Sequence, residues 1–180
     1  MKKCVSIVLV FCLLLAAAAC GASTSAPEKV VKTYIDSLKK GDFDAAAKCV
    51  KGAVDYPADV AGEMIHNTFP FISYTISGCE IDGDRAAVAA DITNVDMNKL
   101  FMTLIPEVME QEGAGASDEE VEAFVVRRSE ELMNKPLAAK VTSSVEISLQ
   151  RVEGKWYVVE DGALWDALTG GLYGMVMGGD

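Results

Sequence analysis

The last third of the chain contains a long run in which apolar and polar residues alternate. The run extends from Leu137 to Gln150, and the turn signal Glu153-Gly154 connects it to a second apolar and aromatic run at residues 155–159. A period of two predicts a strand that buries one face, and a Gly-containing turn between two such runs predicts an antiparallel hairpin. The apolar face of such a sheet needs a covering layer, which the rest of the chain must supply.

A second hairpin is predicted earlier in the chain. From Phe71 to Ser77, apolar residues alternate with Ser and Thr, and Asp82-Gly83 is a hairpin turn signal. Residues 85–95 then return as another strand. Its apolar face carries Val88, Ala90 and Ile92. The chain is therefore expected to form a sheet of about four strands.

Helices are predicted before the first hairpin and after the last. Ser25 to Glu28 combine a hydroxyl N-cap, an early Pro and a Glu, which mark a helix start. The apolar residues that follow share one helical stripe that ends at Gly41: Val30, Val31, Tyr34, Ile35 and Leu38. Asp42 caps a short second helix, a third is predicted over 58–68, and a closing helix contains residues 164–172. We expect the first helix to cover the sheet.

The segment between the two hairpins, residues 97–135, has helical rather than alternating periodicity. Gly113 to Ala116 break it into two amphipathic helices, and Ser117 caps the second. Their outer face is acidic: Glu107, Glu110, Glu112, Asp118, Glu119, Glu120, Glu122, Glu130 and Glu131. Such a face is either simply solvated or a site for a basic partner or for cations. The predicted fold class is α+β, with N-terminal helices packed on a curved antiparallel sheet and a helical hairpin inserted between strands two and three.

The first nineteen residues are typical of a signal peptide. Met1-Lys2-Lys3 is a short cationic start, and the uncharged run from Cys4 to Ala19 has sixteen residues. About 20 residues are needed to cross a bilayer core, so a permanent transmembrane helix is disfavoured. A single domain is then expected over 26–180.

Ala17-Ala18-Ala19-Cys20-Gly21 resembles the lipobox of bacterial lipoproteins. The resemblance implies that Cys20 becomes the first residue after cleavage and carries a diacylglycerol. Residues 20–25 would be a lipidated tether, and the protein would be held at the extracytoplasmic side of the cell membrane. An ordinary secreted protein and an uncleaved anchor remain the alternatives. Loss of Lys2 and Lys3 would leave 14 basic against 27 acidic residues, a net charge of −13.

Residues 27–46 and 145–156 resemble the first helix and terminal hairpin of the nuclear transport factor 2-like (cystatin-like) lipoprotein families. This resemblance implies a cone-like domain and a location in the cell envelope. Enzymes with this cone place Asp, His or Tyr in a cavity between sheet and helix. Tyr34 and Tyr74 could line such a cavity here, or could be core residues. Asp91 alternates out of phase with its apolar neighbours and should point away from the cavity.

The sequence contains no recognisable catalytic constellation, and we expect no metal and no cofactor. His66 is the one histidine, no Gly-x-Ser-x-Gly elbow is present, and metal-ligand spacings such as Cys-x-x-Cys are absent. The non-functional interpretation of His66 is that it is simply a histidine at the end of a helix. Asp82-Gly83-Asp84 is interpreted as a turn, because the other oxygen ligands of a calcium loop are missing.

A further prediction concerns the remaining thiols. Cys49 and Cys79 either form a disulfide, which export permits, or are two independent thiols.

The net charge of −11 for the whole chain excludes generic nucleic-acid binding. The predicted function is a non-catalytic, membrane-anchored module that binds an unknown protein or small molecule, and the alternative is a small-molecule enzyme that uses the cone cavity.

Overall fold

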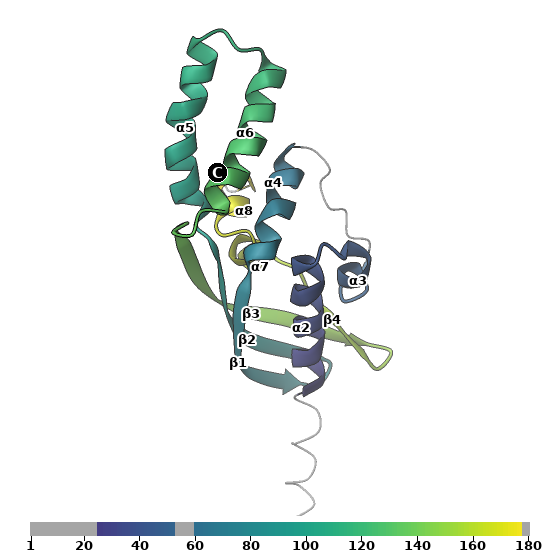
Figure 1. Ribbon diagram of the computed structural model, residues 1–180. Helices are drawn as coiled ribbons and strands as arrows, with labels where there is room; N and C mark the ends of the chain where they lie inside the picture. The colour runs from purple at the N-terminus through teal and green to yellow at the C-terminus, as the bar shows by residue number, and fades with distance from the viewer. Residues whose placement is uncertain (1–24, 53–59, 178–180) are drawn as a thin grey trace, which may run out of the picture.

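The computed structural model describes residues 25–52 and 60–177 (Figure 1). The helices before the sheet are α2 (Ser25–Lys39), α3 (Phe43–Ala47), α4 (Val60–Thr68) and the 3-10 turn η1 (Phe69–Phe71). The strands are β1 (Ser73–Asp82), β2 (Arg85–Val95), β3 (Lys140–Val152) and β4 (Lys155–Val158). Between β2 and β3 lie α5 (Met97–Gly113) and α6 (Asp118–Met133), and after β4 lie α7 (Gly162–Leu168) and α8 (Leu172–Met177). This arrangement confirms the predicted α+β class.

The four strands form one antiparallel sheet in the order β1-β2-β3-β4. Val88 on β2 lies opposite Ile147 on β3, and both side chains are buried on the inner face. The outer face is polar, as the alternation predicts: Asp91 is exposed and accepts a hydrogen bond from Ser144 Oγ at 2.6 Å. The prediction that Asp91 points away from the core is confirmed.

Two helices cover the inner face of the sheet. α2 contacts β1, β2 and β4, and α7 contacts β2 and β3. The stripe predicted on the first helix is buried, with Tyr34 and Ile35 fully enclosed. Between the two helices, the rings of Phe69 and Trp165 lie 6.3 Å apart, which joins the η1 turn to α7. The expected cover helix is therefore confirmed, with α7 as a second cover.

The structure corrects two strand boundaries. Phe71 belongs to the η1 turn, because Pro70 favours a tight helical turn there, and β1 begins only at Ser73. Leu137 was expected in a strand, but β3 begins at Lys140. A turn closes from Lys135 O to Ala138 N at 3.0 Å, with Pro136 at its second position, and Leu137 is left 96% exposed.

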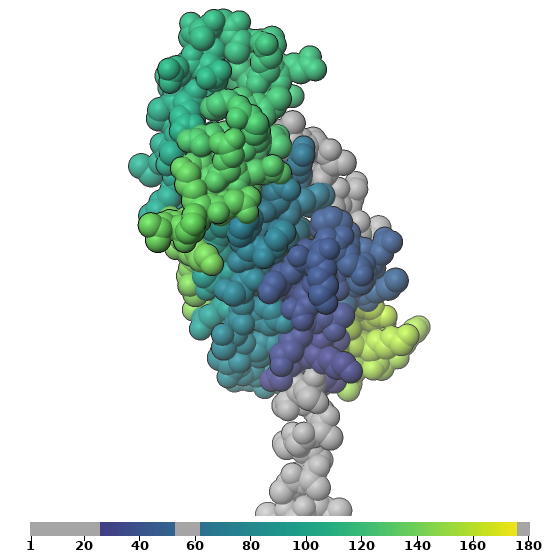
Figure 2. Space-filling view, viewed as in Figure 1, coloured from purple at the N-terminus to yellow at the C-terminus, as the bar shows by residue number. Residues whose placement is uncertain are grey.

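The inserted helical pair projects from one end of the sheet, and α2 begins at the opposite end (Figure 1). In the space-filling view the pair forms a separate lobe above the body of the molecule (Figure 2). Asp96 and Ser117 cap α5 and α6 through their side chains. Arg128 on α6 holds Glu107 on α5 through two hydrogen bonds, at 2.6 Å and 2.8 Å. The predicted insertion is confirmed.

The predicted signal peptide (1–19), the lipidation site Cys20 and most of the tether lie outside the described residues. Within the described part of the chain, none of the helices combines the length and the apolar character needed to cross a membrane.

Candidate binding groove at the base of the helical pair

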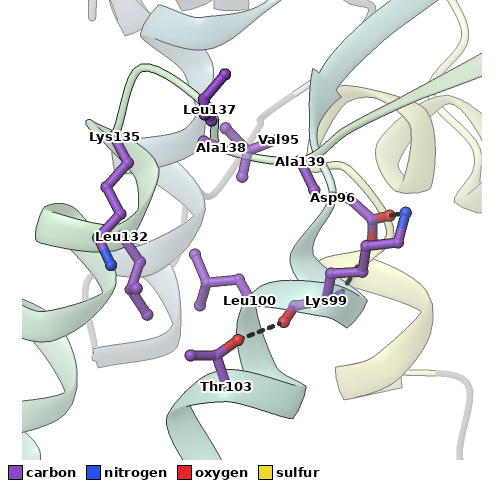
Figure 3. Close-up of a pocket in the computed structure, with 10 residues that line it drawn as sticks. All are labelled: Val95, Asp96, Lys99, Leu100, Thr103, Leu132, Lys135, Leu137, Ala138 and Ala139. Atoms are coloured by element: carbon purple, nitrogen blue, oxygen red, sulfur yellow. Dashed lines mark hydrogen bonds and ion pairs between the residues drawn. The ribbon is translucent and has the colours of Figure 1, made fainter.

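A groove lies where the inserted helices meet the sheet. It is formed by the end of β2, the first two turns of α5, the end of α6 and the turn that follows α6 (Figure 3). Its volume is about 230 Å³, somewhat below the roughly 300–1,000 Å³ typical of pockets for drug-sized ligands. The lining residues are Val95, Asp96, Lys99, Leu100, Thr103, Leu132, Lys135, Leu137, Ala138 and Ala139.

The interior of the groove is apolar. Leu100 and Leu132 point toward one another from α5 and α6, and Leu137 stands at the outer edge (Figure 3). Leu100 and Leu132 are largely buried, whereas Leu137 is almost fully exposed. An exposed leucine beside a hollow with apolar walls offers contact area that the fold itself does not use.

Charged side chains stand on two sides of the groove. Lys99 Nζ lies 3.0 Å from Asp96 Oδ2, and the backbone N–H of Lys99 donates to Asp96 Oδ1 at 3.1 Å. Burial alone would raise the pKa of Asp96, but these contacts with Lys99 outweigh burial and lower it. Lys135 lies on the other side (Figure 3). The pKa of Glu107 is lowered mainly by its hydrogen bond with Arg128 and, to a smaller extent, by the positive charge of Lys135. The groove therefore carries two lysines against one carboxylate.

Backbone contacts from distant segments fix the floor of the groove. The N–H of Asp96 donates to the carbonyl of Ala139 at 2.8 Å, and the N–H of Met97 donates to the carbonyl of Gly170 at 3.0 Å. Gly170 approaches so closely that a Cβ there would lie 1.8 Å from the carbonyl oxygen of Val95. The junction between α7 and α8 thus sets the position at which β2 turns into α5.

Tyr34, for which cavity lining and core packing were the two alternatives, is a core residue. Its side chain is 0% exposed, and its hydroxyl donates to Glu160 Oε1 at 2.5 Å. Burial raises the pKa of Glu160, although the hydrogen bond from Tyr34 acts in the opposite direction. Glu160 lies shortly after β4, which ends at Val158, and no pattern in the sequence marks it as the partner of a residue in the first helix.

Tyr74 is half-buried on β1 and binds α2. Its hydroxyl donates to Asp36 Oδ1 at 3.0 Å, and Lys39 Nζ lies 5.9 Å from the centre of its ring. Burial, together with the hydrogen bond and negative charge of Asp36, raises the pKa of Tyr74 to about 12. Neither Tyr34 nor Tyr74 is among the residues that line the groove.

Cys49 and Cys79 are free thiols in the structure. Cys49 lies beside β4, because its carbonyl accepts a hydrogen bond from the N–H of Val158 at 2.8 Å. Cys79 is on β1, at the other edge of the sheet. These edges lie three strand spacings of about 4.8 Å apart, whereas a disulfide requires the two Cα atoms to lie within roughly 7 Å of each other. The alternative of two independent thiols fits this arrangement.

His66 is in the last turn of α4, as expected, and its ring centre lies 4.5 Å from that of Phe43. Burial lowers its pKa. In the two described ranges, no group of three or more His, Cys, Asp and Glu side chains is arranged to hold a metal ion.

Comparisons with known proteins give one structural similarity. No protein-family model matches the sequence, and no curated protein matches it. Among solved structures, the chain is similar to a candidate lipoprotein (ycdA) of Bacillus subtilis, with 19% sequence identity and a TM-score of 0.45. The match covers 78% of this chain and 46% of that chain, so this chain spans about half the length of the other.

Proposed function

We propose that the protein is a non-catalytic lipoprotein, anchored through Cys20 at the extracytoplasmic side of the membrane, and that the groove at the base of the helical pair is its ligand site. The ligand class is a small carboxylate with a short apolar chain. We also propose that the domain belongs to the nuclear transport factor 2-like group. The packing of helix α2 across a curved antiparallel sheet supports this part of the proposal.

The observation that carries the proposal is the combination of apolar walls and two lysines in one hollow. Leu100, Leu132 and Leu137 offer contact to an apolar chain. Lys99 and Lys135 offer N–H donors and positive charge, and an ammonium group accepts no hydrogen bonds. A ligand with an acidic head and an apolar body matches both features, whereas a cation would meet the net positive charge that Lys99, Lys135 and Asp96 together leave in the groove.

The buried state of Tyr34 supports the non-catalytic part of the proposal. Its hydroxyl is enclosed and already donates to Glu160. A general acid or base must reach its substrate within hydrogen-bond distance, directly or through one water. A substrate could therefore reach Tyr34 only if the packing between α2 and the sheet opened.

The direction of the chain also fits a membrane anchor. α2 begins at the end of the molecule opposite to the helical pair (Figure 1). An anchor on Cys20 would be joined to α2 by a tether that reaches at most about 18 Å. Such an anchor would hold the body of the domain near the bilayer and direct the helical pair away from it.

Methyl NMR of the full chain in phosphatidylcholine nanodiscs tests the ligand site. Sodium hexanoate is titrated while the ¹³C methyl signals of Leu100 and Leu132 are followed. We expect saturable shifts, a weaker affinity in Lys135→Ala, and an unchanged affinity in the control Lys155→Ala, whose lysine is exposed on β4. Absence of saturable shifts, or equal shifts with hexylammonium, would refute the proposed ligand class.

A further inference from the structure

The outward face of α5 carries an apolar stripe that is separate from the groove. Met102, Ile105 and Met109 are 77%, 55% and 65% exposed. Their spacing of three and four residues places the side chains on one face of the helix, one above the other. Three large apolar side chains in a row on a solvated helix are a common sign of an interaction surface.

The stripe is not needed to hold the helical pair together. α5 buries Leu100 and Leu104, which lie on the opposite side of the helix. α6 and α5 are also joined by the hydrogen bonds between Arg128 and Glu107. α5 therefore has two apolar faces, of which one packs within the protein and the other contacts solvent. Methionine is flexible and polarizable, so a surface with two exposed methionines can adapt to a partner's side chains.

Carboxylates surround the end of this stripe. Glu112 is exposed and lies one turn beyond Met109 on the same side of α5. Glu110 is also exposed, and it lies on the flank of the stripe, about 100° round the helix from Met109. Asp118 and Glu119 begin α6 nearby and are also exposed. Arg127 and Arg128 bind Glu131 and Glu107, and the ion pairs among the described residues include none of these four carboxylates. The negative charge at this end is therefore not neutralised within the described chain.

We propose that the α5 stripe is a docking surface for a basic amphipathic helix of a partner protein. The apolar side of such a helix would pack on Met102, Ile105 and Met109, and its Lys or Arg residues would lie near Glu110 and Glu112. Helix-on-helix recognition uses anchors at this spacing. The same charge disfavours the other occupants: a second copy would bring like charges together, and an anionic lipid surface would repel the stripe.

A synthetic peptide tests the charge and shape of this surface. The probe is LKKLLKLLKKLLKL, and its matched control replaces every Lys by Glu and keeps the apolar face. Each peptide is added to the full chain in phosphatidylcholine nanodiscs, with empty nanodiscs as reference. The ¹³C methyl signals of Met102 and Met109 report occupancy of the stripe, and fluorescence anisotropy gives the Kd. We expect the Lys peptide to shift both signals and the Glu peptide to bind at least tenfold more weakly.

Variants separate docking on the stripe from attraction to an acidic protein. Ile105→Glu adds a negative charge, so non-specific attraction would strengthen, whereas loss of the stripe should weaken binding at least tenfold. Met175→Glu is the control, because Met175 is 39% exposed and lies on α8. Glu110→Gln combined with Glu112→Gln should weaken binding about threefold to tenfold and reduce its dependence on salt. Circular dichroism checks that each variant keeps the wild-type fold.

Three results would overturn the proposal. The first is equal binding of the Lys and Glu peptides, which would mean that charge plays no part. The second is a concentration-dependent dimer that Ile105→Glu abolishes, which would make a second copy the occupant. The third is a shift of the Met102 and Met109 signals by vesicles of phosphatidylglycerol, which would make the occupant a lipid surface.

Discussion

Replacement of Gly170 by Ala tests whether the C-terminal helices fix the shape of the groove. Gly170 has a φ of +62°, and an L-residue in that conformation costs about 1–2 kcal/mol. The new Cβ would lie 1.8 Å from the carbonyl oxygen of Val95. The backbone would have to move, and overpacking of this kind costs a further 1–3 kcal/mol or so. The expected loss is therefore about 2–5 kcal/mol, which lowers the Tm of a domain this size by roughly 4–20 °C.

Gly154→Ala is the matched control for this change. Gly154 also has a positive φ, +80°, but nothing lies within 4 Å of a Cβ added there. It should lose only the conformational part, about 1–2 kcal/mol. Thermal denaturation followed by circular dichroism compares the two variants, and a hexanoate titration at a temperature below both transitions measures the groove. Equal losses of stability, or an unchanged hexanoate affinity in Gly170→Ala, would refute the reasoning.

Further predictions concern the core pair, the anchor and the thiols. Tyr34→Phe removes the donor to the half-buried carboxyl of Glu160, so chemical denaturation should show a loss of about 1–3 kcal/mol. Because burial raises the pKa of Glu160, the folded state binds its proton more tightly than the unfolded state. Wild-type stability should therefore fall relative to Glu160→Gln as the pH rises from 4 to 7, and a pH-independent difference between the two would contradict this. Cys20→Ala should abolish the incorporation of radiolabelled palmitate and release the protein from the membrane, and a variant that stayed bound would contradict the anchor. Alkylation in denaturant without reductant should modify Cys49 and Cys79, and detection of a disulfide between them by mass mapping would contradict their placement at opposite sheet edges.

Elements with a local signal were predictable from the sequence. The bounds of β2, Arg85–Val95, agree with the predicted strand, because a turn signal and strict alternation lie in the same short segment. The helical pair was predictable for a similar reason: Ser117 caps α6 through its side chain, and Gly113 ends α5. Each of these signals acts between residues a few positions apart, so no knowledge of the tertiary structure is required.

The groove and the buried pair depend on contacts between distant segments. Leu137 continues the alternation of β3 in the sequence, but the turn at Pro136 removes it from the strand and places it beside the groove. Tyr34 and Glu160 are separated by 126 positions, and α2 packs beside β4 only in the folded chain. Periodicity identifies Tyr34 as a core residue, but it contains no information about the carboxylate that accepts its hydrogen bond.

The selectivity between hexanoate and hexylammonium, measured on the wild-type chain and on Lys135→Glu, tests the proposed ligand class most directly. Two unit charges about 4 Å apart interact by about 1 kcal/mol in water and by more in a partly enclosed groove, so reversal of one charge should change the selectivity by at least about tenfold. We expect the wild-type groove to prefer hexanoate and the variant to lose that preference. Equal selectivity in the two proteins would show that the lysine beside the groove does not recognise the ligand's carboxylate.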